Sequence, residues 1–334
     1  MASYFERLTA IPEIGREGLR ALQSADIAIV GTGGVGSAAA WSLAALGIGR
    51  LRLLDQDIVE VSNLHRLSGI DQNDLHAPKA EALARRIKSR YPWTNATPTV
   101  ETVRNENCSS LLGEAELILD GTDNFQTRYA LNRFSIKNKV PYLFTSAIAN
   151  QGHISLFSPP QTPCLECMLP GQETDPMQSC ETLGVSPTTV GIIGALAASE
   201  AAKSILGLPS KIKGQLLTLD LGELDLITAK ISKRPMCRAC SNSSHDDGET
   251  TKVVMLCGGG VANVLPDEDK LLNLPFVQNK IPDKNVIAIS DSVLVYNRES
   301  YRVSIFKTGR LLISKVDTEE TASRIAREIW SEIA

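Results

Sequence analysis

The sequence predicts an α/β protein built on a doubly wound, mostly parallel β-sheet that antiparallel strands extend, with a small α+β domain at the C-terminal end. Three observations lead to this prediction. A glycine-rich turn follows the first apolar segment, strand-like and helix-like segments alternate as far as residue 150, and strand-like segments follow one another beyond it. Such alternation is typical of a parallel sheet with helices on both faces.

The first predicted β-α-β unit is the clearest element. A strand rich in Ile and Val at 26–30 leads into a GTGGVG turn, an alanine-rich helix ends at Gly47, and a second strand at 51–54 leads to Asp55. Glycines at such a turn let a phosphate chain approach a helix N-terminus, and the acidic residue can bind ribose hydroxyls. The motif does not separate NAD from ATP, and it lacks the ending of a P-loop. We predict a Rossmann-like nucleotide site that comprises Gly31, Gly33, Gly34, Gly36 and Asp55.

The later elements continue the alternation. After Asp55 we expect a helix from near Pro78, strands at 99–103, 117–119 and 141–145, and a helix that ends near Lys137. Beyond Asn150 the segments HISLFS, QLLTLDL and LDLITAKI are expected to form strands, and a helix at 187–206 interrupts them.

A polar segment at 241–251 is typical of a linker because it has Gly and Ser but no apolar anchor. We therefore divide the chain into a nucleotide-binding domain, residues 1–245, and a small α+β domain, residues 246–334. The second domain contains the short strand-like segments VIAIS, VLVY, RVSIF and LLIS and a closing helix at 319–333. The sequence assigns no role to it.

The composition is that of an ordinary globular protein, with 43% apolar and 22% charged residues and a net charge of −4. A nucleic-acid-binding protein normally presents a basic surface, so we expect no nucleic-acid partner. The N-terminal segment has no apolar run of the secretory type, and no segment reaches the roughly 18 unbroken apolar residues of a membrane span. We expect a cytoplasmic protein without a membrane partner.

Charged and amide side chains follow the predicted second and fourth strands and begin the helix near residue 78. The carboxyl ends of the strands of a doubly wound sheet meet at one edge, so these side chains are expected to converge beside the phosphates of the nucleotide. Two cations with a carboxylate suit a triphosphate and Mg²⁺ better than a nicotinamide. The residues concerned are Asp57, Asn63, Arg66, Lys79, Asp123 and Asn124.

Four motifs, GTGGVG, LLDQDIVEVSNLHR, APK and DGTDN, occur in this order. Together they resemble the adenylating domain of the ThiF/MoeB/HesA family, the bacterial relatives of ubiquitin-activating enzymes, and the resemblance extends from about Arg7 to about Cys240. It implies an adenylyltransferase that uses ATP and Mg²⁺ to adenylate the C-terminal glycine of a ubiquitin-like sulfur-carrier protein. Pyrophosphate leaves, and the product serves thiamine, molybdopterin or related biosynthesis with the help of a sulfur donor.

The resemblance also implies a role for each matched residue. Arg7 falls on an arginine that reaches the ATP of the neighbouring subunit, which implies a homodimer. The sequence departs from the family pattern at Tyr4, Leu8 and His65. The other matched positions are Gly34 for the nucleotide, Asp55 for the ribose, Asn63, Arg66 and Lys79 around the phosphates and the attacking carboxylate, and Asp123 with its neighbour Asn124 for Mg²⁺.

Two Cys-x-x-Cys pairs predict a structural zinc site formed by Cys164, Cys167, Cys237 and Cys240. This spacing lets two thiolates of one pair share a tetrahedral Zn²⁺, and four thiolates leave no open position for water. A chain without a secretory signal is expected in a reducing compartment, which favours metal over disulfides. Members of the family carry the same pairs.

Two further cysteines stand apart. Cys180 falls where sulfur-transferring members of the family carry a reactive cysteine, and a nearby helix N-terminus would favour its thiolate. The alternative is a small apolar residue in a loop. Cys257 precedes three glycines as in a rhodanese loop, but the segment is short and we assign it no sulfurtransferase role.

Three alternatives remain open. The substrate could be the C-terminus of a short peptide, as in the maturation of peptide antibiotics. The fold could also present a peptide without catalysis, although the three charged residues Arg66, Lys79 and Asp123 argue for catalysis. An NAD-dependent oxidoreductase ranks last because the cysteine pairs would have no role in it.

Overall fold

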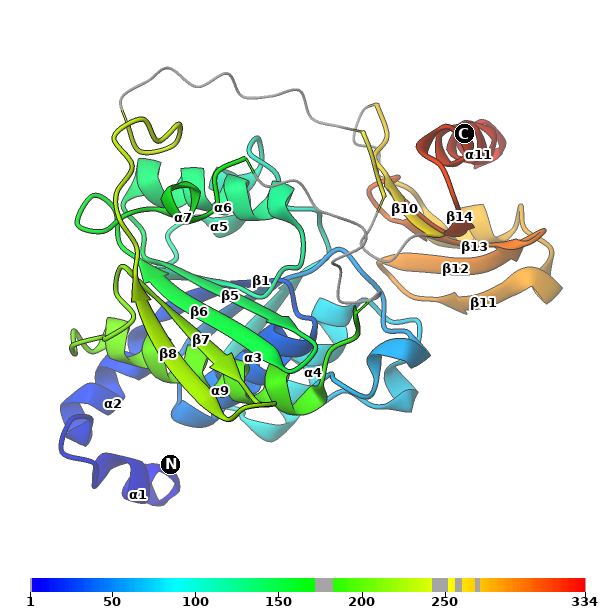
Figure 1. Ribbon diagram of the computed structural model, residues 1–334. Helices are drawn as coiled ribbons and strands as arrows, with labels where there is room; N and C mark the ends of the chain where they lie inside the picture. The colour runs from blue at the N-terminus through cyan, green and yellow to red at the C-terminus, as the bar shows by residue number, and fades with distance from the viewer. Residues whose placement is uncertain (1, 172–182, 242–251, 256–259, 268–270, 334) are drawn as a thin grey trace.

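The computed structural model describes residues 2–171, 183–241, 252–255, 260–267 and 271–333, which form two β-sheets (Figure 1). The larger sheet has the order β3-β2-β1-β4-β5-β6-β7-β8. The first five of these strands pair in parallel, and the last three are antiparallel to their neighbours, which confirms the predicted fold class. The strands are β1 (Asp26–Val30), β2 (Arg50–Leu54), β3 (Asn95–Thr99), β4 (Leu117–Asp120), β5 (Tyr142–Ile148), β6 (Gln151–Phe157), β7 (Gln215–Asp220) and β8 (Asp225–Lys230).

Helices cover both faces of the larger sheet (Figure 1). In β1, Ile27 and Ile29 pack with one group of helices, while Ala28 and Val30 pack with the other, because successive side chains of a strand point to opposite faces. Burial on both faces explains why the strand reads as a continuous apolar run. One face carries α3 (Gly34–Leu46), α4 (Lys79–Arg90) and α9 (Pro187–Ile205), and the other carries α5 (Cys108–Leu112), α6 (Phe125–Asn138) and α7 (Leu165–Met168).

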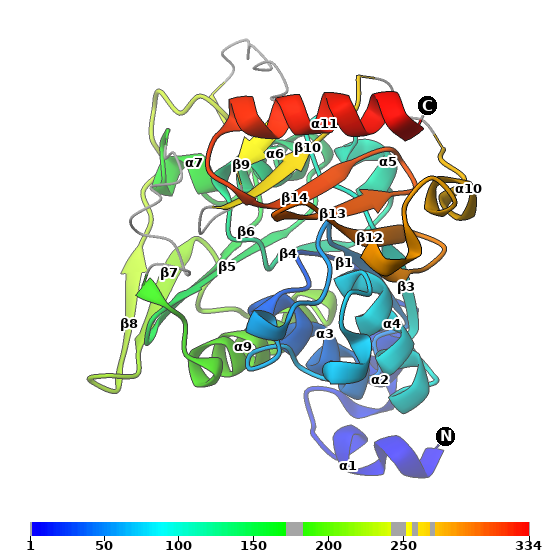
Figure 2. The same cartoon turned by 90° about the vertical axis from the view of Figure 1, so that its right-hand side faces the viewer.

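Short helices precede β1 and connect β2 to α4. The N-terminal segment folds as η1 (Ala2–Phe5), α1 (Glu6–Thr9) and α2 (Gly15–Ser24), and it lies away from the smaller sheet (Figure 2). The ring of Phe5 is buried edge-on against Trp93, with 5.0 Å between ring centroids. The connection from β2 to α4 contains η2 (Val61–Asn63) and η3 (Gln72–Asp74).

The prediction of a strand at 99–103 is wrong. The third strand is β3, which ends at Thr99, and its residues are mostly polar and include Pro98. Proline is disfavoured inside a sheet, but β3 is the edge strand, where a missing N–H donor is tolerated. Val103 lies outside any strand and is buried on the α6 side of the larger sheet, and Val100 packs against residues of the smaller sheet.

The smaller sheet is antiparallel throughout, with the order β11-β12-β13-β14-β10-β9. The predicted closing helix coincides with α11 (Glu319–Ile333), which packs on one face of this sheet (Figure 2). The predicted boundary between residues 245 and 246 lies outside the described residues. The elements are β9 (Val253–Met255), β10 (Gly260–Val264), α10 (Leu274–Gln278), η5 (Asp283–Asn285), β11 (Val286–Ile289), β12 (Val293–Arg298), β13 (Tyr301–Phe306), β14 (Leu311–Val316) and α11.

The face of the smaller sheet opposite α11 packs against the larger domain. Val295 and Phe306 form a buried cluster with Ile58, which follows β2, and Val100, which follows β3, lies beside it. The smaller sheet therefore sits over the carboxyl ends of two parallel strands. In the described part of the chain, none of the helices combines the length and apolar character that crossing a bilayer requires.

Candidate functional site

The glycine turn after β1 is held close to the loop that follows β4. Gly31 has a φ of +84°, and a Cβ there would lie 2.7 Å from the carbonyl carbon of Gly121. A Cβ on Gly36 would lie 1.8 Å from the Gly31 carbonyl oxygen, so both positions exclude side chains. At Gly33 an added Cβ would meet nothing within 4 Å, so this glycine leaves its backbone open towards a ligand.

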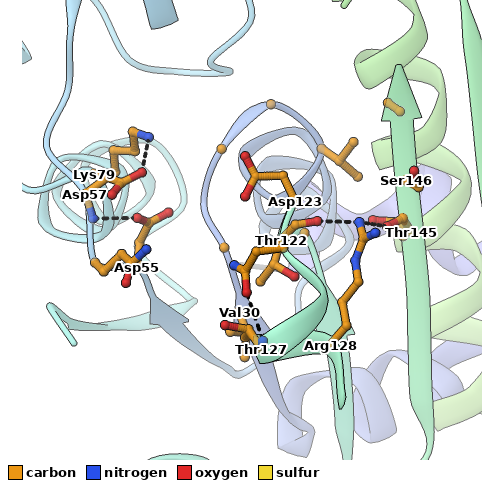
Figure 3. Close-up of a pocket in the computed structure, with 18 of the residues that line it drawn as sticks. Val30, Asp55, Asp57, Lys79, Thr122, Asp123, Thr127, Arg128, Thr145 and Ser146 are labelled. Atoms are coloured by element: carbon orange, nitrogen blue, oxygen red, sulfur yellow. Dashed lines mark hydrogen bonds and ion pairs between the residues drawn. The ribbon is translucent and has the colours of Figure 1, made fainter. Parts of the chain in front are cut away.

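A pocket opens beside this turn, at the carboxyl ends of the parallel strands (Figure 3). The loops after β1, β2, β3 and β4 and the end of β5 line it, together with residues at or near the starts of α3, α4, α6 and α9. The predicted residues that line it are Gly31, Gly33, Gly34, Asp55, Asp57, Arg66, Lys79, Asp123 and Asn124.

Asp55 is buried at the base of the pocket. Its carboxylate accepts hydrogen bonds from the backbone N–H of Thr32 at 2.6 Å, from the Thr32 hydroxyl at 3.0 Å and from the N–H of Asp57 at 2.8 Å. Burial raises the pKa of Asp55, and the nearby charge of Lys79 opposes the rise. These contacts fix the carboxylate beside the glycine turn, where a ribose would lie.

Lys79 is the first residue of α4 and points into the same pocket (Figure 3). Its Nζ lies 2.9 Å from Asp57 Oδ2, and its backbone N–H donates to the Asp57 carbonyl at 2.9 Å. Burial disfavours the ammonium ion, but the carboxylates of Asp57, Asp55 and Asp123 outweigh it and raise the pKa of Lys79. The ammonium ion is therefore held charged in a partly buried position, as a group that binds phosphate must be.

Asp123 and Asn124 lie between β4 and α6. Asp123 projects into the pocket, opposite the pair of Asp57 and Lys79 (Figure 3). Asn124 is the N-cap of α6, and its Oδ1 accepts the backbone N–H of Thr127 at 2.8 Å. In this structure the Asn124 side chain therefore shapes the loop that presents Asp123.

Of the predicted residues that the structure describes, Gly36, Asn63 and Arg7 do not line this pocket. Gly36 lies behind the turn, and the Asn63 side chain bonds to its own segment, accepting the Glu60 N–H at 3.4 Å. Arg7 is exposed on α1 and does not line the pocket. Cys180 lies outside the described residues.

Arg128 lines the pocket but was not predicted. It is buried, and its Nη2 donates to the carbonyls of Thr122 at 2.6 Å and Thr145 at 3.2 Å (Figure 3). Its Nε lies 3.6 Å from the buried carboxylate of Asp120. Arg128 thus ties the loop after β4 to β5. Its position four residues after Asn124, on the same face of the helix, was a signal for it in the sequence.

The four predicted zinc ligands form one cluster beneath α6. Their sulfurs all lie within 4.8 Å of one another. The shortest separations are 3.5 Å between Cys167 and Cys240 and 3.6 Å between Cys164 and Cys237. A tetrahedron with Zn–S bonds of about 2.3 Å has S···S edges of about 3.8 Å, so the donor type and the spacing both fit Zn²⁺.

Comparison with known proteins gives the following. Residues 5–239 match the sequence model of the ThiF family. A sulfur carrier protein adenylyltransferase of Thermus thermophilus is 30% identical over 244 residues, which are 71% of this chain and 90% of that protein. A sulfur carrier protein ThiS adenylyltransferase of Bacillus subtilis is 27% identical over 323 residues, which are 94% of this chain and 95% of that protein.

Among solved structures, E. coli MccB with MccA-N7isoASN is similar in fold. The TM-score is 0.63 at 19% sequence identity, and the match covers 72% of this chain and 75% of that chain.

Proposed function

The chain belongs to the ThiF family, and on that premise we propose that it adenylates the C-terminal carboxylate of a ubiquitin-like sulfur-carrier protein with ATP. The observation that carries the proposal is the pocket, which Arg66, Lys79 and Asp123 line together with the glycine turn and Asp55. This combination offers a ribose acceptor, open backbone at the phosphates, two cations and a carboxylate.

The reaction is an in-line displacement. A carboxylate oxygen of the substrate forms a bond to the α-phosphorus of ATP, the bond from that phosphorus to the bridging oxygen breaks, and pyrophosphate leaves. Negative charge grows on the α-phosphate and on the leaving group, where Arg66 and Lys79 stabilise it. Asp123 would hold Mg²⁺, which supplies further charge neutralisation when bound. The protein contributes positioning and electrostatics and forms no covalent bond in this step.

The names of the relatives support the proposed substrate class. The proteins from T. thermophilus and B. subtilis are named for sulfur-carrier proteins, and the carrier ThiS is named in the second. We expect the carrier chain to end in glycine, a residue without a side chain for the pocket to accommodate. The MccB structure with MccA favours a second candidate, the C-terminus of a short peptide.

Three further features belong to the proposal. Zn²⁺ in the four-cysteine cluster would tie α7 to the segment after β8, in a closed shell without catalytic access. A homodimer would bring Arg7 of one subunit to the ATP of the other, which its exposed position outside its own pocket allows. In a cytoplasmic sulfur-transfer pathway, a sulfur donor would consume the acyl adenylate, with or without a covalent step at Cys180.

ATP–pyrophosphate exchange tests the function. Purified protein should catalyse exchange only in the presence of a carrier with an intact C-terminus, and removal of the last two carrier residues should abolish it. Asp123→Ala should lower exchange at least about 100-fold without changing the melting temperature, because it removes one charged contact from the transition state. Near-wild-type exchange by this variant would refute the assignment. Exchange with a short peptide but no carrier would favour the second candidate.

A further inference from the structure

The segment after β2 is held by the smaller sheet as well as by the larger one. Gln56 stands between Asp55 and Asp57 and lines the pocket. Its backbone carbonyl accepts a hydrogen bond from Nη2 of Arg310 at 2.5 Å. Arg310 lies in the turn between β13 and β14, so the smaller sheet reaches the wall of the nucleotide pocket directly.

The side chain of Gln56 closes a buried network between three distant parts of the chain. Its Oε1 accepts the Thr102 hydroxyl at 2.8 Å and Nδ2 of Asn263 at 3.3 Å. Oδ1 of Asn263 in turn accepts Nη1 of Arg310 at 3.0 Å. Asn263 and Arg310 are each only 1% exposed. The loop that carries the two pocket aspartates therefore has its backbone and its side chain fixed by the smaller sheet.

The charged group of Arg310 is buried beside an aromatic ring. Its guanidinium stacks over the ring of Phe306, 3.5 Å from the centroid, and its Nε has no hydrogen-bond partner among the described residues. Burial lowers the pKa of Arg310 to about 10, while the carboxylates of Asp57, Glu101 and Asp55 oppose the change. All three carboxylates line the pocket. A buried cation without compensation is costly. Here the three carboxylates that line the pocket compensate the charge of Arg310.

We propose that Arg310 is a positioning residue of the nucleotide site. It fixes the backbone at Gln56, so that Asp55 keeps its orientation towards the ribose and Asp57 keeps its contact with Lys79. The smaller domain is then an integral part of the ATP site and acts on ATP affinity rather than on the chemical step. This inference rests on the proposed function, because it assumes that the pocket binds ATP.

Arg310→Met tests the inference, with Arg302→Met as a matched control. Arg302 also joins the smaller sheet to the segment after β2, through an ion pair with Glu60 at 2.6 Å, but neither residue lines the pocket. We expect Arg310→Met to raise the Kd for ATP in calorimetry and the KM for ATP in pyrophosphate exchange about tenfold, the effect of one charged hydrogen bond, with little change in kcat. Arg302→Met should leave both within about twofold.

The inference is overturned if folded Arg310→Met has wild-type Kd and KM, or if Arg302→Met loses affinity to the same extent. Should Arg310→Met fail to fold, Arg310→Lys decides, because lysine keeps the cation but its single ammonium group cannot reproduce the two-nitrogen contact with the Gln56 carbonyl and Asn263 Oδ1. A severalfold rise in Kd then supports the inference, and an unchanged Kd contradicts it. Wild-type protein that binds no ATP contradicts the proposed function itself. Wild-type binding with an unaffected Arg310→Met contradicts only the inference.

Discussion

Lys79→Met offers a direct test of the charge balance in the pocket. The substitution keeps most of the length of the side chain and removes the ammonium ion that lies 2.9 Å from Asp57. Loss of one partner of a buried ion pair costs about 3–5 kcal/mol. The Asp57 side chain is 29% exposed, so water compensates part of the loss. We expect a decrease of about 2–3 kcal/mol in the free energy of unfolding near pH 8.

The cost should depend on pH. Burial already raises the pKa of Asp55, and Lys79 is the main group that opposes the rise, so the variant should raise this pKa further. A carboxyl whose pKa is higher in the folded than in the unfolded protein lowers stability increasingly as the pH rises through the window between the two values. The deficit of the variant should therefore shrink when the pH is lowered from 8 towards 5.

Urea unfolding of both proteins at pH 8 and pH 5.5 measures the deficit, and Lys88→Met, at an exposed position of the same helix, is the control. Pyrophosphate exchange by Lys79→Met should fall about 100-fold or more, because a cation at the developing charge is lost. An equal deficit at the two pH values would refute the electrostatic reasoning. Wild-type exchange by the variant would refute the role of Lys79 in the site.

Two further predictions concern the glycine turn and the cysteine cluster. Gly36→Ala places a methyl group 1.8 Å from the Gly31 carbonyl oxygen and should destabilise the protein by about 3 kcal/mol or more, whereas Gly33→Ala should cost about 1 kcal/mol or less, as thermal unfolding can measure. Equal costs would contradict the close approach described for this turn. Removal of metal with a chelator should lower the Tm by about 5 °C or more and release Zn²⁺ at about one ion per chain. Unchanged melting after complete chelation would rule out a structural metal.

The parts of the site that the sequence could predict are those in which local pattern and topology coincide. The Gly31 turn and Asp55 follow two apolar strands in one β-α-β unit, and parallel strands place their ends at one edge. Lys79 and Asp123 were found by the same rule. Each lies at the start of an element or shortly after a strand, so no knowledge of tertiary packing was needed.

The missed features depend on contacts that no local pattern records. The residues of β3 are largely polar, and β3 lies at the edge of the sheet, where only one of its sides is paired. It therefore lacks the continuous apolar run that made the central strands predictable. Arg310 and Gln56 are separated by 254 positions, and nothing in either segment points to the other. A domain boundary drawn at a polar segment also suggests independence, whereas the two sheets share a buried network at Asn263.

The cysteine cluster has a topological consequence for the polypeptide between its two pairs. With Zn²⁺ bound, the stretch from Cys167 to Cys237, which carries α9, β7 and β8, becomes a ring closed at its base by metal–sulfur bonds. A single cut by a protease inside this ring cannot separate the two pieces, because each piece keeps two cysteine ligands to the same ion. Nicked protein would then migrate as a single species in its native state and divide into two fragments only when denaturant and chelator act together.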